Sequence, residues 1–166
     1  MHYQGKLYRA LNPIYARKPL SGRGAASYGG RFNSKGTAAL YLATSFQTAI
    51  REANQIGDLQ PTTIVAYNAD IENIFDGRDS AELNKFNMTL AGLSDPSWRD
   101  QMRAAGKAQT QIFAETLICE GFNGLLVSSF ARGASEDDVN LVLWKWSNQP
   151  PSKITLIDDN GRLDRI

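Results

Sequence analysis

Residues 27–53 read SYGGRFNSKGTAALYLATSFQTAIREA and hold a glycine-rich turn, a short apolar run and a helical pattern. The run AALYLA at 38–43 predicts a strand, and Ser45 suits the N-cap of a helix that follows directly. Apolar residues of that helix recur at the spacing of one buried face: Phe46, Ala49, Ile50 and Ala53. Gly57 is expected to end the helix, so the stretch predicts a loop, a strand and a helix in succession.

Outside this stretch, strand and helix patterns follow one another in no regular order. A helix is expected at 108–120, ended by Gly121, and residues 74–106 are polar and lean toward helix. Residues 12–30 predict a long loop rich in glycine, proline and basic side chains. Further strands are expected at 6–11, 62–70, 124–130, 139–146 and 153–157. With no internal repeat and no linker, residues 1–166 are predicted to form a single α+β domain of mixed strand order.

The composition excludes several classes of partner. The 166 residues are 42% hydrophobic, which suits one domain with its own core. The chain has 18 lysines and arginines against 17 acids, so no overall field recruits nucleic acid or an anionic membrane, although a local basic cluster can still bind phosphate. No apolar run is long enough for a signal peptide or a membrane span, and a soluble, cytoplasmic protein is expected.

Metal and thiol chemistry are not expected. Cys119 is the single cysteine, so it cannot form an internal disulfide, and its apolar helical context predicts a buried, inert thiol. His2 is the single histidine and is expected to be a frayed terminal residue. These two residues predict neither a metal site nor a Cys/His catalytic pair.

Residues 27–53 nevertheless carry groups with chemical potential. The two glycines before Arg31 permit positive φ and a close backbone approach to a ligand, and the guanidinium offers a planar fork that suits phosphate. If Leu40 and Leu42 face the core, the two-residue period of a strand places Tyr41 on the opposite face, where its ring can stack on a flat heterocycle. Glu52 lies off the apolar face near the end of its helix, where the helix dipole does not favour a carboxylate, which is consistent with a chemical role.

Each of these residues also has a purely structural interpretation. An arginine after two glycines is commonly a surface residue of a turn, a strand tyrosine commonly packs within a sheet, and a helical glutamate is usually solvated. The same alternative applies to Arg9 in the first strand and to Ser128 and Ser129 in LLVSSFARG. Alternation within LVLWKW predicts Trp144 and Trp146 as core residues.

The blocks LYRA, GGRFNSKGTAALYLATSFQTAIRE, GFNGLLVSSFARG and NLVLWKW occur in the order and approximate spacing of a known family. With these blocks the chain resembles, from Tyr8 to Trp146, the RES-domain toxins of bacterial toxin–antitoxin modules. The family's arginine then corresponds to Arg31, its tyrosine to Tyr41, its glutamate to Glu52 and its first-strand arginine to Arg9.

The family serine commonly follows a proline after a strand like GLLV. Ser128 stands in the place of that proline here, which makes Ser129 the match and leaves Ser128 as the alternative. The resemblance implies a role for each matched residue: Arg31 and Arg9 on the pyrophosphate of NAD+, Tyr41 on the nicotinamide ring, Ser129 or Ser128 on the nicotinamide amide or the ribose, and Glu52 on the developing charge of the ribose.

The resemblance also implies a fold and an activity. The fold is ADP-ribosyltransferase-like, with two small mixed β-sheets that clasp NAD+ in a cleft between them and with flanking helices. The activity is cleavage of the bond between nicotinamide and ribose, with water or phosphate as acceptor, which depletes NAD+ and arrests growth. No cofactor beyond NAD+ as substrate and no metal is implied.

Two other classes of function share these residues or this fold. The same arginine, tyrosine and glutamate serve a mono-ADP-ribosyltransferase that modifies a protein target, and a non-catalytic NAD+-binding protein is the third possibility. The family further implies an Xre-type antitoxin encoded nearby, which forms a hetero-oligomer with the toxin and blocks the cleft. Contact with nucleic acid is then expected only indirectly, through the antitoxin, and no membrane contact is expected.

Overall fold

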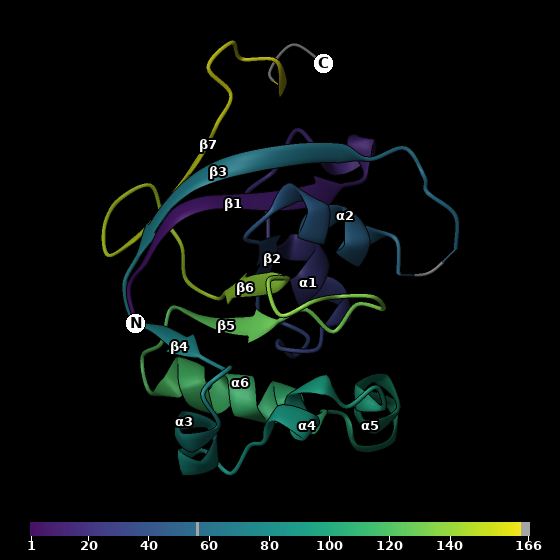
Figure 1. The fold of residues 1–166 in the computed structure, drawn as a ribbon, viewed down its shortest axis with the longest axis vertical. Helices are drawn as coiled ribbons and strands as arrows, with labels where there is room; N and C mark the ends of the chain where they lie inside the picture. The colour runs from purple at the N-terminus through teal and green to yellow at the C-terminus, as the bar shows by residue number, and fades with distance from the viewer. Residues whose placement is uncertain (56, 164–166) are drawn as a thin grey trace.

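A computed structural model describes residues 1–55 and 57–163, and its fold combines strands and helices (Figure 1). The strands are β1 (Tyr3–Leu11), β2 (Leu40–Ala43), β3 (Thr63–Ile71), β4 (Ile74–Asp76), β5 (Gly124–Ser128), β6 (Val139–Leu143) and β7 (Ser152–Leu156). The α-helices are α1 (Arg23–Tyr28), α2 (Phe46–Ala53), α3 (Ser80–Lys85), α4 (Leu90–Ser94), α5 (Trp98–Ala105) and α6 (Gln109–Cys119), and a 3-10 turn, η1, spans Pro13–Tyr15. The α+β class predicted from the sequence is confirmed.

The strands form one mixed sheet in the order β4-β5-β6-β2-β1-β3-β7. Adjacent strands are antiparallel except β4 and β5, which are parallel. β1 and β3 pair along their full length, from Tyr3 opposite Ile71 to Leu11 opposite Thr63. β1 and β2 are joined at a single residue pair, Tyr8 opposite Ala43, so the sheet has one weak seam.

The sheet curls at this seam until its two halves face each other. One apolar cluster contains Leu7 of β1 and Val65 of β3 together with Leu126 of β5 and Leu141 of β6, so both halves bury side chains in the same core. Figure 1 shows the halves as stacked layers. The expectation of two small sheets is therefore corrected: the hydrogen bonds make one seven-stranded sheet, although its halves face each other as two sheets would.

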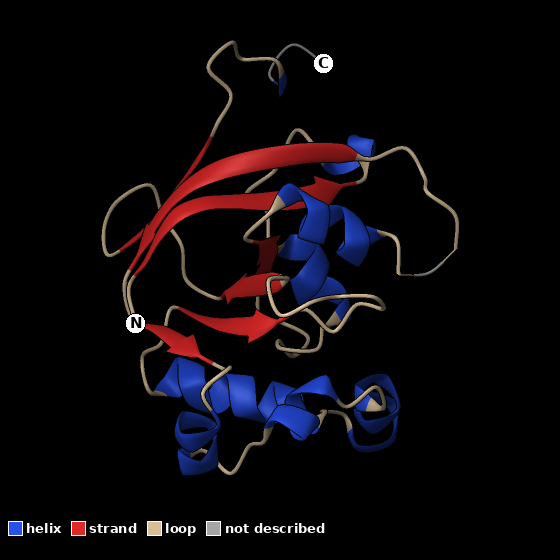
Figure 2. Ribbon diagram, viewed as in Figure 1, coloured by secondary structure: helices blue, strands red, loops and turns tan. Residues whose placement is uncertain are grey.

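A second apolar cluster lies on the other face of β5 and β6. The two-residue period of a strand sends Leu125 and Val142 into this cluster while Leu126 and Leu141 enter the first one. Phe113 of α6 is buried in it, and helices α3 to α6 gather on this side, away from β1 and β3 (Figure 2). Helix α2 packs instead against β1, β2 and β3, next to the seam.

Helix α2 starts as predicted and ends earlier. The Ser45 hydroxyl accepts a hydrogen bond from the Thr48 amide, 3.1 Å away, which is the expected N-cap. The C-cap is Asn54 rather than Gly57. The predicted buried face is wrong except at Ala49, since its other members are exposed: Phe46, Ile50 and Ala53. The helix is anchored instead through the buried side chain of Thr48.

Residues 74–106 contain β4 and three short helices, two of which have side-chain N-caps, Asp79 and Thr89. Residues 12–30 are less irregular than expected, since they include η1 and α1. Gly121 follows α6 with a φ of 90°, which agrees with the predicted helix stop. Among the described residues, no helix is long and apolar enough to cross a membrane.

Several single-residue predictions are wrong or are confirmed only in part. Cys119 is exposed, because it lies on the solvent side of the last turn of α6, whereas Leu117 of the same turn is buried. His2 is not frayed: its Nε2 lies 2.5 Å from a carboxylate oxygen of Asp70 on the neighbouring strand. The core assignment of Trp144 and Trp146 is confirmed in part: both follow the end of β6 and pack half-buried against the two apolar clusters. Their indole N–H groups donate to the carbonyl oxygens of Phe32 and Leu20.

Candidate functional site

The carboxylate of Glu52 lies half-buried at the centre of the candidate site. Its Oε1 accepts hydrogen bonds from the Ser129 hydroxyl and from Asn140 Nδ2, the latter at 2.5 Å. Its Oε2 accepts a bond from the side chain of Gln55, in the turn after α2. The buried Ser129 and the half-buried Asn140 fix one oxygen of the carboxylate, and the exposed Gln55 side chain covers the other.

Strand pairing explains why Ser129 and Asn140 meet. β5 and β6 are antiparallel neighbours, and the Ser129 amide extends their ladder by donating to the Asp138 carbonyl at 2.7 Å. The Ser129 hydroxyl also accepts a bond from the Ala131 amide at 3.2 Å, so it has both a donor and an acceptor role. Ser128 pairs with Val139 at the end of β5, and the strand period turns its side chain to the opposite face.

A buried acid stabilises the helix that carries Glu52. Asp138 accepts bonds from the Thr48 hydroxyl of α2 at 2.7 Å and from the Ser135 amide at 2.8 Å, and it forms an ion pair with Arg51. The backbone bond from Ser135, the Thr48 hydroxyl and the Arg51 charge lower the pKa of Asp138 to about 2. Asp138 therefore ties α2 to the start of β6, beside Glu52 and Asn140.

Two hollows adjoin at Glu52 and share Tyr41, Glu52 and Asn140 in their walls. The first, of about 350 Å³, is also lined by Tyr8, Arg9 and Ala10 of β1 and is named the Arg9 hollow. The second, of about 310 Å³, is also lined by Arg31, Trp98, Arg99 and Phe130 and is named the Arg31 hollow. Each hollow thus has one of the predicted arginines in its wall and Glu52 at the junction.

Arg31 is held by backbone carbonyls and aromatic rings. Its Nη1 donates to the carbonyl oxygens of Leu93 at 3.1 Å and Asp95 at 2.8 Å. The guanidinium carbon lies 5.0 Å from the Phe130 ring centroid and 5.8 Å from that of Trp98. Burial lowers the pKa of Arg31, and the charge of the neighbouring Arg99 lowers it further.

Arg9 is anchored in a similar way. Its Nη1 donates to the carbonyl oxygens of Pro19 at 3.2 Å and Ser21 at 3.3 Å, so it ties the loop after η1 to β1. The hydroxyl of Tyr67 donates to the same Pro19 oxygen at 2.7 Å, and burial raises the pKa of Tyr67 to about 12. Burial lowers the pKa of Arg9.

Tyr41 connects the glycine-rich turn to the site. Its hydroxyl accepts a bond from the Phe32 amide at 3.0 Å and donates to Asn33 Oδ1 at 2.7 Å. Burial raises the pKa of Tyr41, so the hydroxyl stays protonated and acts as a donor. Gly30 is required because a Cβ there would lie 2.3 Å from the Tyr41 hydroxyl: the close approach expected of this turn is to Tyr41.

Comparison with known proteins identifies the family of the chain. The RES domain family model matches residues 6–165, nearly the whole chain.

The chain belongs to the RES-domain family.

A relative from Yersinia enterocolitica serotype O:8 / biotype 1B (strain NCTC 13174 / 8081), named Toxin Res, is 48% identical over 74% of this chain and 74% of its own length.

In this RES domain the predicted site residues lie around one point, with one exception. The two hollows are lined by Arg9, Arg31, Tyr41 and Glu52, and the Ser129 hydroxyl donates a hydrogen bond to Glu52. Ser128, the alternative serine, belongs to the opposite face of β5. The structure brings these residues together, and their roles in binding and catalysis remain predictions.

Sequence reasoning missed several residues of the RES-domain site. Asn140 and Asp138 were not singled out, because their contacts with α2 join residues 88 and 90 positions apart. Trp98 and Arg99 lie in a segment whose short helices have no readable period. A polar side chain at 140 in an otherwise apolar strand was the one available signal.

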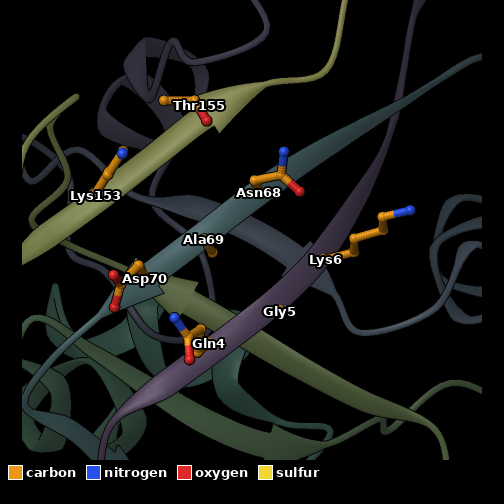
Figure 3. A pocket seen from close by; sticks show the side chains of 8 residues that line it. All are labelled: Gln4, Gly5, Lys6, Asn68, Ala69, Asp70, Lys153 and Thr155. Carbon is orange, nitrogen blue, oxygen red and sulfur yellow. The ribbon is translucent and has the colours of Figure 1, made fainter.

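A third hollow of the RES domain, of about 380 Å³, lies away from Glu52 on β1, β3 and β7 (Figure 3). Figure 3 shows Lys6 and Lys153 on opposite sides of it, and its acid, Asp70, pairs with His2. This is the solvated face of an antiparallel sheet, and polar side chains are expected there. Within residues 1–55 and 57–163, no group of three or more His, Cys, Asp and Glu side chains lies close enough to hold a metal ion.

Proposed function

We propose that this RES domain is a toxin that cleaves NAD+ at the bond between nicotinamide and ribose. The observation that carries the proposal is the position of Glu52, a fixed carboxylate at the junction of two hollows that each have an arginine in the wall. The name of the Yersinia relative, Toxin Res, supports the toxin assignment. A site built around one carboxylate and two cations suits a substrate with a pyrophosphate and a centre that becomes positive during reaction.

The reaction requires little from the protein beyond binding and charge stabilisation. The carbon–nitrogen bond breaks with its electron pair going to the nicotinamide nitrogen, which becomes neutral, and positive charge develops on the ribose. The carboxylate of Glu52 offsets this charge, which it does more strongly in the transition state than in the ground state. Water then adds to the anomeric carbon and loses a proton, which gives nicotinamide, ADP-ribose and one proton. Inorganic phosphate as acceptor gives a phosphorylated ADP-ribose instead.

The Arg9 hollow and the Arg31 hollow together would bind NAD+. Arg31, with Arg9 as second partner, would hold the pyrophosphate, and the ring of Tyr41 would pack against the nicotinamide. In this proposal the seam between the halves of the curled sheet is the counterpart of the cleft in an ADP-ribosyltransferase-like fold. No cofactor beyond NAD+ as substrate is assigned.

The contacts of Ser129 favour a role different from the one that the resemblance implied. Its hydroxyl donates to Glu52 and accepts from the Ala131 amide, and the residue is 9% exposed. The hydroxyl's one donor position and one of its acceptor positions are thus used within the protein, which favours a role in orienting the carboxylate over a role in binding the nicotinamide amide. We therefore assign Ser129 and Asn140 as positioning residues for Glu52.

The test of the proposed function is incubation of the purified protein with NAD+ alone, followed by chromatographic measurement of free nicotinamide. We expect the wild type to release nicotinamide and Glu52→Gln to lose this activity. The control Glu120→Gln, which changes an exposed glutamate at the end of α6, should release nicotinamide like the wild type. ADP-ribose on a protein in a cell extract, without nicotinamide release from NAD+ alone, would instead indicate mono-ADP-ribosyl transfer.

The toxin assignment implies a restraining partner in the cytoplasm. We expect an Xre-type antitoxin, encoded nearby, that binds the protein as a hetero-oligomer and contacts DNA on its behalf. Expression of the RES domain alone should arrest growth, and co-expression with the neighbouring gene's product should restore growth and give a complex that co-purifies. Normal growth with soluble, folded RES domain alone would contradict the assignment.

A further inference from the structure

Arg99, on the first turn of α5, brings a second cation to the wall of the Arg31 hollow. Its guanidinium carbon lies 4.3 Å from the ring centroid of Trp98, and that of Arg31 lies 5.8 Å from the same centroid. Trp98 is 7% exposed and therefore well fixed, so one buried indole orients both guanidinium groups. Stacking on a fixed ring reduces the side-chain freedom that Arg99 loses when it binds a ligand.

The charges of these two arginines are only partly offset by nearby acids, since Glu52 and Asp95 act on Arg31 without forming an ion pair with it. Among the described residues, neither Arg31 nor Arg99 takes part in an ion pair. Arg31 donates to neutral carbonyl oxygens, and the carboxylate of Asp95 is occupied by bonds from Ser97 and Gln101. Glu52 is the acid in the wall of this hollow.

Arg31 also keeps part of its donor capacity for a ligand. Both of its bonds to carbonyl oxygens use Nη1, and within residues 1–55 and 57–163 its Nε and Nη2 have no hydrogen-bond partner. Arg99 is exposed and makes no side-chain hydrogen bond to the described residues. Two guanidinium groups with free donors beside the same hollow match the oxygens of a phosphate group, which accept several charge-assisted bonds.

We propose that Arg99 and Arg31 form a phosphate subsite at the Trp98 end of the Arg31 hollow. The inference rests on the proposed function and extends it, because a phosphate group can enter the site from two sources. It is either the pyrophosphate of NAD+ or free inorganic phosphate that serves as acceptor. In both cases Arg99 is a specificity-determining residue, and its charge reaches the ligand through bonds that a neutral side chain cannot replace.

The binding test is calorimetric titration of the protein with inorganic pyrophosphate and, separately, inorganic phosphate. The variants are Arg99→Gln and the control Arg103→Gln, which removes an exposed arginine of the same helix that pairs with Asp100. Wild type and Arg103→Gln should bind at least one of the two probes with equal affinity, and Arg99→Gln should bind it about tenfold more weakly. Since Arg99 is exposed, a thermal melt should show the variant folded.

Nicotinamide release distinguishes the two sources. If the subsite holds the pyrophosphate of NAD+, Arg99→Gln raises KM for NAD+ about tenfold in phosphate-free buffer. If it holds the acceptor, that KM stays unchanged and the variant needs about tenfold more phosphate to accelerate release.

Three results would each overturn the subsite. The first is that wild type and Arg99→Gln bind both probes equally well, and the second is that Arg103→Gln loses as much affinity as Arg99→Gln. The third is that wild type binds neither probe. Because calorimetry needs no turnover, a protein that binds pyrophosphate through Arg99 but leaves NAD+ intact would overturn the proposed function alone.

Discussion

Replacement of Ser129 by alanine tests whether this serine acts on Glu52 or on the substrate. The change removes the hydroxyl that donates to Glu52 Oε1 and leaves Asn140 Nδ2, 2.5 Å away, on the same oxygen. A hydrogen bond to a charged group contributes about 1.5–3 kcal/mol, which corresponds to roughly 10- to 150-fold in rate. Because Asn140 remains, we expect a loss near the lower limit, about 10- to 30-fold in kcat.

The same substitution has a second, structural consequence. The amide of Ala131 loses its 3.2 Å acceptor in a buried position, so the free energy of unfolding should fall by about 1–3 kcal/mol. KM for NAD+ should stay within about threefold of wild type, because a group that orients the carboxylate makes no contact with the substrate. Replacement of Asn140 by alanine as well should then remove most of the remaining activity.

The assay is initial-rate measurement of nicotinamide release over a range of NAD+ concentrations, beside thermal melts. Ser128→Ala is the matched control, since this neighbouring serine lies on the opposite face of β5 and should keep wild-type kinetics. A raised KM with unchanged kcat in Ser129→Ala would refute the positioning role and favour direct substrate binding. The full loss in Ser128→Ala instead would assign the family serine to the other residue.

Three further changes test the surroundings of the site. The fold lowers the pKa of Asp138 to about 2, so the stabilisation that its carboxylate gives is complete above about pH 4 and disappears as pH falls toward about pH 2. The melting temperature of Asp138→Asn should therefore be lower than that of wild type at neutral pH and should fall less on acidification. Parallel curves of melting temperature against pH for the two proteins would show that Asp138 is not the source of the acid sensitivity. Arg31→Lys keeps the charge and loses the planar fork, so calorimetry should show NAD+ bound about tenfold more weakly. Unchanged affinity in both Arg31→Lys and Arg31→Ala would mean that Arg9 or the basic side chains of residues 12–30 bind the pyrophosphate instead. Tyr41→Phe keeps the ring but leaves the Phe32 amide without its acceptor, so denaturant unfolding should show a loss of about 1–3 kcal/mol; a variant as stable as wild type would mean that this bond does not hold the turn.

Local patterns in the sequence were sufficient to predict strand β2 and the N-cap of α2, which carry residues of the site. Leu40 and Leu42 are buried in the first core and Tyr41 faces the other side, as the two-residue period of a strand predicts. Ser45 caps α2 because its hydroxyl reaches an amide three residues ahead, a contact that a local sequence pattern encodes.

The orientation of α2 could not be predicted in this way. Apolar spacing predicts a helix that buries Phe46 and Ile50, but they are 49% and 37% exposed. The helix is held by Thr48 and Arg51 on Asp138, a polar contact with a residue far along the chain. Hydrophobic periodicity measures only the apolar contribution to packing, so a helix anchored by a buried acid is assigned the wrong face.

The composition of the site was likewise only partly readable. Arg31 and Glu52 belong to one continuous motif, whereas Asn140 reaches Glu52 only because β6 lies beside β2 and β5 in the folded sheet. Trp98 and Arg99 belong to α5, and helices of five to eight residues in this segment are too short for a reliable period. Contacts that depend on topology required the structure.

The most direct test of NAD+ cleavage is nicotinamide release by Glu52→Gln at saturating NAD+. Glutamine keeps the volume of the side chain and one acceptor oxygen but removes the negative charge, so binding of NAD+ and the melting temperature should stay near wild type. The developing charge on the ribose loses its partner, and kcat should fall about 100- to 1000-fold. Activity within about threefold of wild type, which is less than 1.4 kcal/mol of barrier, would contradict the assignment of Glu52 as the group that stabilises the transition state.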